Sequence, residues 1–179
     1  MSGAAAAAPA APGAGATMAP GPCIIDVEAS GFGAGGYPIE VGFVLPDGRA
    51  FCTLIQPEPE WTHWDKAAEQ LHGITRQVAQ QHGLPVLAVA ELLNRELAGR
   101  TVYTDAWAHD YSWLGRLFDA AGRPQGFKLE HLRQLLDEPQ LEQLDSAKRE
   151  ARGALQVQRH RASSDARVLQ WAVGKVLGS

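Results

Sequence analysis

The chain has 179 residues, of which 45% are hydrophobic and 20% are charged, and its formal net charge is −4 at pH 7. This composition predicts a soluble globular protein with a proper core, and it argues against nucleic-acid binding through net charge alone. The two cysteines, Cys23 and Cys52, form no Cys-x-x-Cys pair, which argues against a zinc ribbon. Both lie in apolar runs, where free thiols indicate a reducing compartment, so we expect a cytoplasmic protein.

The N-terminal segment differs in composition from the rest of the chain. Its first twenty residues include ten Ala, three Pro and three Gly, and the first charged side chain is that of Asp26. A secretory signal would need a basic start, and a membrane span would not contain so many Gly and Pro residues. We expect residues 1–21 to form a disordered tail, with Met18 as an alternative start, and residues 22–179 to form one folded domain without a membrane contact.

The first half of the chain predicts three strands followed by helices. The first strand starts with residues 23–26, the second covers 39–45 and the third covers 50–55. Their short connections predict an antiparallel meander. A glycine-rich loop separates the first two strands. A short helix is expected over 65–71, capped by Thr62 or Asp65 and ended by Gly73, with Thr75 capping the next helix.

The second half predicts further helices around two short strands. Apolar spacing and Pro85 predict a helix from 85 to about 97, followed by a strand over 101–104. A helix is expected over 105–121, and Ser163 or Ser164 is expected to cap a final helix. The intervening chain predicts a strand over 127–129 and helices over 129–136 and 141–155.

Four acidic residues occupy positions that favour burial. Asp26 and Glu28 are two positions apart on the first strand, so their side chains point to one face. Asp110 and Asp165 each precede apolar helical positions by three and four residues, which places both on the apolar face. Taken singly, solvation at a frayed strand end explains the first two, and the helix dipole explains the other two.

Together the four carboxylates predict a site for two Mg²⁺ or Mn²⁺ ions, because hard cations prefer oxygen ligands. Such ions can bind the attacking and the leaving oxygen of a phosphodiester. His160 precedes Asp165 by five residues and falls in the loop before the last helix. It is the natural general base, because imidazole ordinarily titrates near neutrality.

These motifs resemble those of the DEDDh 3′–5′ exonucleases, the superfamily of ribonuclease T, oligoribonuclease and the DNA polymerase proofreading subunit. The resemblance covers about residues 22–177. It rests on five segments that occur in the family's order: Asp26-Val27-Glu28-Ala29-Ser30-Gly31, Ile39-Glu40-Val41-Gly42, Leu71-His72-Gly73-Ile74-Thr75, Asp110 followed by Trp113-Leu114, and His160-Arg161-Ala162-Ser163-Ser164-Asp165-Ala166.

The resemblance implies a role for each matching residue. The acids that would bind the two ions are Asp26, Glu28, Asp110 and Asp165, and His160 would activate a water molecule. Phe32 would lie as an apolar wedge against the terminal base, where stacking tolerates any sequence; packing on the core is its alternative. The remaining residues of the first motif that would contact the substrate are Ala29, Ser30 and Gly31.

The sequence also departs from the family pattern. Ala29 stands where relatives usually carry Thr, and Asp105 stands where they carry Asn, with one residue more before Asp110. Asp105 is therefore an alternative ligand or a residue that orients its loop. His72 is predicted to be structural. A basic run is either a solvated helix face or a set of phosphate contacts; it consists of Lys148, Arg149, Arg152, Arg159, Arg161 and Arg167.

We therefore predict an α/β fold, namely an RNase H-like mixed five-stranded sheet with helices on both sides. The predicted function is metal-dependent 3′–5′ exonuclease activity, which releases nucleoside 5′-monophosphates from single-stranded RNA or DNA. One alternative is a catalytically idle fold that binds nucleic acid or protein. Another is a proofreading subunit that depends on a polymerase, although the chain ends two residues after Leu177, which favours a stand-alone enzyme. A homodimer is a further expectation, since dimers are common among the relatives.

Overall fold

The computed structural model describes residues 21–157 and 160–178. The expected disordered tail, including Met18, lies outside the described residues except for Gly21, and so does Arg159 of the basic run. None of the described helices is long and apolar enough to cross a bilayer.

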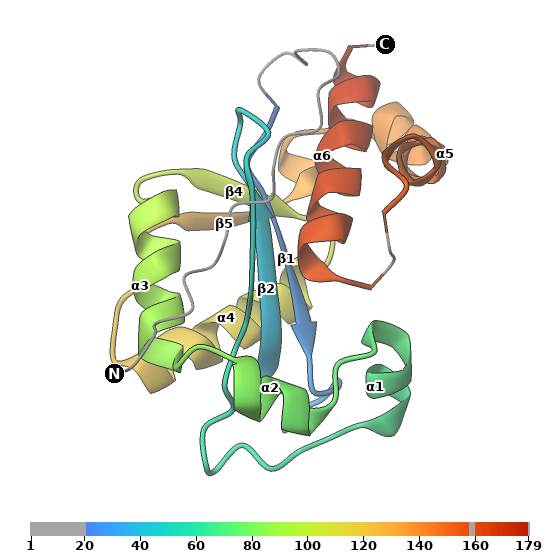
Figure 1. The fold of residues 1–179 in the computed structure, drawn as a ribbon. Coiled ribbons are helices and arrows are strands. Elements are labelled where there is room, and N and C mark those ends of the chain that lie inside the picture. Colours follow the sequence, from blue (N-terminus) through green and yellow to red (C-terminus); the bar gives the residue numbers. More distant parts are fainter. Residues whose placement is uncertain (1–20, 158–159, 179) are drawn as a thin grey trace.

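Five strands form one mixed sheet at the centre of the molecule, as predicted (Figure 1). Its spatial order is β3-β2-β1-β4-β5, in which β1 pairs antiparallel with β2, and β2 pairs antiparallel with β3. The predicted meander is thus confirmed, while β4 and β5 extend the sheet in parallel from β1. The strands are β1 (Ile24–Ala29), β2 (Pro38–Val44), β3 (Ala50–Leu54), β4 (Thr101–Thr104) and β5 (Lys128–His131).

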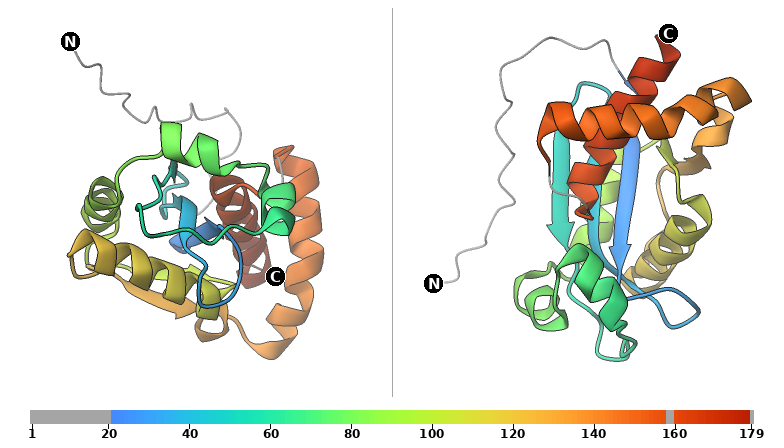
Figure 2. Two further views of the ribbon diagram at one scale, coloured as in Figure 1. Left: turned by 90° about the horizontal axis from the view of Figure 1, so that it is seen from below. Right: turned by 90° about the vertical axis from the view of Figure 1, so that its right-hand side faces the viewer.

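Helices cover both faces of this sheet. On one face α6 packs against β1 and β2, with α5 on its outer side; α3 and α4 cover the other face (Figures 1 and 2). The short helices α1 and α2 lie beyond the end toward which β1 runs. The helices are α1 (Lys66–His72), α2 (Arg76–His82), α3 (Val86–Leu97), α4 (Trp107–Ala121), α5 (Glu138–Leu155) and α6 (Ala162–Leu177).

The alternation of side chains along β1 decides where its acids point. Ile25 and Val27 belong to the core cluster shared with α3 and α4, whereas Ile24 belongs to the cluster shared with α5 and α6. Because successive strand residues face opposite sides, Asp26 and Glu28 share the face of Ile24. The acids of β1 therefore continue the α6 side of the core toward the end of the strand.

Three predicted elements differ from the structure. The helix expected over 129–136 is wrong, because Lys128–His131 pairs with β4 and only a single 3₁₀ turn, Leu132–Gln134, follows. The caps expected at Ser163 or Ser164 are also wrong, since α6 begins at Ala162. Finally, α5 begins three residues earlier than expected, where Asp137 and Gln140 form a reciprocal capping box.

The caps of the two short helices follow the sequence. Asp65, and not Thr62, caps α1 by accepting a hydrogen bond from the backbone N–H of Ala67. Gly73 ends α1 in the left-handed conformation, and Thr75 caps α2 as predicted. His72 is buried and its Nδ1 accepts from the backbone N–H of Ile74, which agrees with a structural role.

Candidate active site

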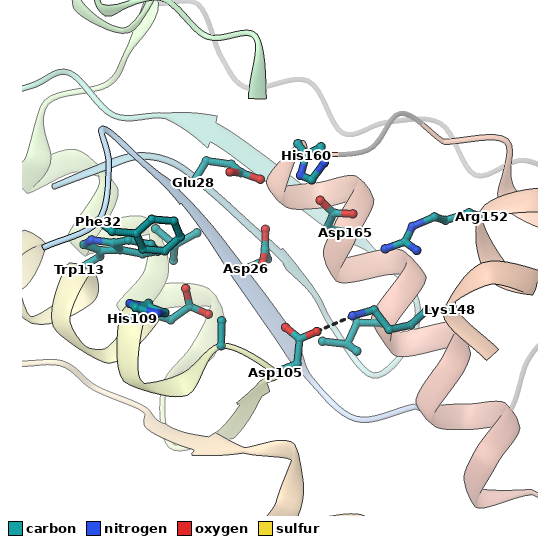
Figure 3. A pocket seen from close by; sticks show the side chains of 14 residues that line it. Asp26, Glu28, Phe32, Asp105, His109, Trp113, Lys148, Arg152, His160 and Asp165 are labelled. Atoms are coloured by element: carbon teal, nitrogen blue, oxygen red, sulfur yellow. Dashed lines mark hydrogen bonds and ion pairs between the residues drawn. The ribbon is translucent and has the colours of Figure 1, made fainter. Parts of the chain in front are cut away.

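A pocket of about 320 Å³ opens where β1 ends between α4, α5 and α6 (Figure 3). It contains the predicted ligands and the predicted base, although these residues are far apart in the sequence. Those that line it are Asp26, Glu28, Asp110, His160 and Asp165. Figure 3 shows the side chains of β1 and those of the α6 side directed toward one another across this space.

Three of the acids form a compact group. Asp26 and Glu28 come from β1, and Asp165 comes from the first turn of α6, which packs on that strand. One carboxylate oxygen from each of the three lies within 4.8 Å of the others. Such an arrangement leaves like charges close together, and a shared cation would relieve their repulsion.

Asp110 approaches the same pocket from α4. This helix starts directly after β4, and Thr104 at the end of β4 joins the two by accepting a hydrogen bond from the Ala106 N–H at 3.1 Å. The Thr104 hydroxyl donates to Oδ2 of Asp110, whose residue is only 1% exposed. Oδ1 of Asp110 is buried and has no hydrogen-bond partner among the described residues. A buried carboxylate oxygen without a donor is the kind of atom that a cation satisfies.

Burial and mutual repulsion raise the pKa values of these acids. Desolvation raises the pKa of Asp26 well above its ordinary value, and the charges of Asp110, Glu28 and Asp165 raise it further. Desolvation, followed by the charge of Asp165, raises the pKa of Glu28 to about 7. Desolvation also raises the pKa of Asp110 to about 8, against the opposing effect of the Thr104 hydrogen bond. Without a cation the cluster therefore retains protons near neutral pH.

These residues fit hard divalent cations. The donor set consists of carboxylate oxygens, one of them buried without a hydrogen-bond partner, and cations would displace the retained protons. The described residues of the cluster include no cysteine, and the chemistry of the set favours Mg²⁺ or Mn²⁺.

His160 lies in the segment between α5 and α6, at the side of the pocket where Glu28 and Asp165 lie (Figure 3). Its φ of +56° is uncommon outside glycine, although His is enriched in this region. Sparsely populated backbone conformations often persist at functional sites, where the surrounding structure enforces them.

The start of α6, which carries Asp165, is fixed to β2. The carboxylate of Glu40 on β2 is fully buried and accepts hydrogen bonds from Nε and Nη2 of Arg161 at 3.0 and 2.6 Å. It also accepts from the Ala162 N–H at 2.9 Å, which gives α6 the cap that Ser163 and Ser164 do not supply. Gly42 allows this close approach, since a Cβ there would lie 2.2 Å from the Ser163 nitrogen.

Of the residues predicted to contact the substrate, Phe32 lines the pocket and the others do not. Phe32 lines the pocket and is 62% exposed, with its ring 4.9 Å from that of His109 and 5.9 Å from that of Trp113. Arg116 donates to the carbonyl oxygens of the loop residues 34–36, and so holds the loop that presents Phe32. The three other predicted contacts are buried or withdrawn from the pocket lining: Ala29, Ser30 and Gly31.

Ser30 is fully buried, and its hydroxyl accepts a hydrogen bond from the Tyr37 N–H at 3.2 Å. Its side chain therefore closes the base of the glycine-rich loop. Gly31 has a φ of +150°, and a Cβ there would meet His63 and Asp65 at 2.7 Å. The substrate role of this segment stays a prediction, and the structure gives it a second task in shaping the loop.

The sequence pattern gave no role to one lining residue, His109, and left the roles of two others, Lys148 and Arg152, open between a solvated helix face and phosphate contacts. His109 stacks on Trp113 with ring centroids 5.5 Å apart, and its position one residue before Asp110 was the available signal. Lys148 and Arg152 line the pocket from α5. The signal for these two was their spacing of four residues, which places both side chains on one face of the helix. Asp105, the alternative ligand, also lines the pocket and forms an ion pair with Lys148 at 2.7 Å.

The raised pKa values predict that the metal-free protein loses stability as the pH rises. The acids bind protons more tightly in the folded chain than in the unfolded chain, so the bound protons stabilise the fold. This stabilisation is lost as the pH rises from about 4 to about 8. Glu28 contributes about 2 kcal/mol of this loss, after allowance for solvent screening. The measurement is thermal unfolding in EDTA at about pH 5 and about pH 8.

The matched variant for this prediction is Glu28→Gln, which should unfold with a weaker pH dependence than the wild type. His72 acts in the opposite direction, because burial lowers its pKa, but both proteins contain it. Mn²⁺ should restore the stability of the wild type at the higher pH. Identical pH profiles for the two proteins in EDTA would contradict the assigned pKa of Glu28.

Comparisons with known proteins identify the fold. No family model matches the sequence, and no curated protein sequence matches it. The chain is similar to exonuclease I from Methylocaldum szegediense, with 15% identity, a TM-score of 0.64, and 87% of this chain aligned to 39% of that chain. It is also similar to E. coli exonuclease I in complex with a dA16 oligonucleotide, with 14% identity, a TM-score of 0.64, and coverage of 87% and 40%.

A third similar structure is the zinc-bound form of an E. coli exonuclease I complex with single-stranded DNA, with 13% identity, a TM-score of 0.62, and coverage of 86% and 38%. The chain thus spans only 38–40% of the length of these three proteins. At such identities the likeness establishes the fold. The predicted RNase H-like α/β architecture with a mixed five-stranded sheet is confirmed.

Proposed function

We propose that this protein is a metal-dependent 3′–5′ exonuclease that acts on single-stranded nucleic acid. The observation that carries the proposal is the convergence of Asp26, Glu28 and Asp165 within 4.8 Å of one another, in a pocket that Asp110 and His160 also line. The fold shared with exonuclease I supports it, since solved complexes of that protein contain single-stranded oligonucleotides.

The proposed chemistry assigns a task to each group of residues. Asp26, Glu28, Asp110 and Asp165 would hold two Mg²⁺ or Mn²⁺ ions. When bound, the ions supply positive charge to the scissile phosphate and to the leaving 3′ oxygen. His160 would accept the proton of the attacking water, from a segment at the edge of the pocket.

The exposed ring of Phe32, beside His109 and Trp113, is suited to stack on the terminal base. Stacking accepts every base, because each has a π-face. This favours an enzyme that removes nucleotides one at a time without sequence preference. Hydrolysis at the leaving 3′ oxygen gives nucleoside 5′-monophosphates as products.

The test compares the wild type with His160→Ala on a 5′-labelled single-stranded oligonucleotide in Mg²⁺ or Mn²⁺. The wild type should give a ladder that shortens from the 3′ end, and the released nucleotides should co-elute with 5′-monophosphates. His160→Ala should be slower by about 10²- to 10⁴-fold, because a general base is lost. The control is His82→Ala, which replaces an exposed histidine at the end of α2.

Equal rates of digestion by the wild type and His160→Ala would overturn the assignment of His160 as the general base. Binding of the oligonucleotide in Mn²⁺ without any product would overturn the exonuclease proposal and favour an idle binding module. The same assay should compare short RNA, long RNA and single-stranded DNA, and the fastest digestion identifies the preferred substrate. A preference for RNA over DNA would indicate a contact to the 2′-hydroxyl.

A further inference from the structure

Arg152 lines the pocket from α5, across from the carboxylates of β1 (Figure 3). Its Nε is buried and has no hydrogen-bond partner, and no hydrogen bond or ion pair of its guanidinium occurs within residues 21–157 and 160–178. Buried donors are nearly always satisfied, so an unused one is unusual. A guanidinium carries five N–H donors in a rigid fork, so Arg152 leaves more hydrogen-bonding capacity unused than the single buried Nε.

The other cations near the pocket already have partners. Lys148, one turn earlier on α5, forms the ion pair with Asp105, and Arg161 is held by Glu40. Arg152 forms no ion pair with Asp165, although both side chains line the same pocket. Arg152 is therefore the lining cation whose charge remains available, within the part of the chain that the structure describes.

We propose that Arg152 binds a backbone phosphate near the 3′ end of the nucleic acid and positions the strand against the acidic cluster. This rests on the proposed nuclease function. The guanidinium fork matches two non-bridging phosphate oxygens, and such charge-assisted hydrogen bonds are about twice as strong as neutral ones.

The electrostatics of the chain favour such a contact. The protein has a net charge of −4, and five carboxylates line the pocket, of which only that of Asp105 is paired with a cation. Phosphates approaching this surface are repelled until cations are bound. An unpaired arginine on the wall opposite the β1 carboxylates supplies fixed positive charge within the pocket, and its attachment to α5 gives it a defined direction.

The test measures binding by fluorescence anisotropy, with a labelled single-stranded oligonucleotide and Ca²⁺ in place of Mg²⁺, over a series of KCl concentrations. Arg152→Gln should weaken binding by about 10-fold or more and reduce the slope of log K against log salt by about 0.7. The matched control is Arg149→Gln, which removes the same charge from an exposed position of α5 and should leave both values near those of the wild type. Thermal stability of Arg152→Gln should not fall, because no hydrogen bond is lost.

A second arm replaces one phosphate at a time with an uncharged methylphosphonate at the three linkages nearest the 3′ end. The wild type should lose affinity when the phosphate at one of these linkages is replaced. The same replacement should cause no further loss of affinity in Arg152→Gln. Equal weakening by Arg152→Gln and Arg149→Gln, or a large loss of thermal stability in Arg152→Gln, would overturn the phosphate contact. If binding depends on Arg152 but the wild type does not digest any strand in Mg²⁺ or Mn²⁺, the nuclease proposal fails and the contact stands.

Discussion

Asp26→Asn is expected to slow hydrolysis severely and, at the same time, to stabilise the metal-free protein. Asp26 belongs to the compact group of three carboxylates, and the charges of Asp110, Glu28 and Asp165 all act on it. Asparagine keeps the size of the side chain and is neutral without a proton, so folding no longer requires a buried carboxyl to take up a proton that the unfolded chain has released. The loss of one ligand removes several kcal/mol of transition-state stabilisation, which corresponds to a rate about 1,000-fold lower.

The two effects are measured separately. Digestion of a labelled oligonucleotide gives the rate, and thermal unfolding with and without Mn²⁺ gives the stability. The wild type should gain stability when Mn²⁺ is added, because the ion binds the folded cluster, whereas Asp26→Asn should gain much less. In EDTA near neutral pH, Asp26→Asn should unfold at a higher temperature than the wild type.

Asp145→Asn is the matched control, since Asp145 is exposed on α5 and does not line the pocket. It should resemble the wild type in rate and in its response to Mn²⁺. A metal-free Asp26→Asn protein that is less stable than the wild type would mean that the Asp26 carboxylate stabilises the fold without a cation. That result would remove the basis for a metal site at the end of β1.

The sequence predicts this cluster well because its signals are local. The spacing of Asp26 and Glu28 on a strand defines their common face, and helical spacing places Asp110 and Asp165 on apolar faces. Burial of these faces places the acids inside the fold, and the packing of α4 and α6 on β1 brings them to one pocket. The sheet order and the crossing to β4 and β5 could be expected only through the resemblance, since periodicity does not determine which strands pair.

The features that sequence reasoning missed all depend on contacts between distant segments. Glu40 is an acidic residue within an otherwise apolar strand, and its partner Arg161 lies 121 positions further along the chain, where no local pattern points to it. The start of α6 was misplaced for the same reason, because its cap comes from β2 and not from a neighbouring serine. Likewise, the availability of Arg152 is visible only once Lys148 is seen to pair with Asp105.

Glu40→Gln is expected to lower the free energy of unfolding by about 3 kcal/mol, because it breaks a buried ion pair while Arg161 stays partly exposed. The amide keeps the volume and can accept from the Ala162 N–H, but it cannot satisfy the guanidinium. The start of α6 should then shift away from β2 and carry Asp165 with it. Chemical denaturation gives the stability, and oligonucleotide digestion gives the activity, which should fall even below the unfolding transition.

A double-mutant cycle separates the ion pair from a general effect on the core. Arg161→Gln and the double variant complete the cycle, and the double variant should be more stable than the sum of the two single losses predicts. Additive losses would mean that Glu40 and Arg161 stabilise the protein independently. Gly42→Ala disturbs the same contact without a change of charge, since its Cβ would meet the α6 backbone. If the position of α6 determines activity, Gly42→Ala and Glu40→Gln must both slow digestion, because both displace the helix that carries Asp165.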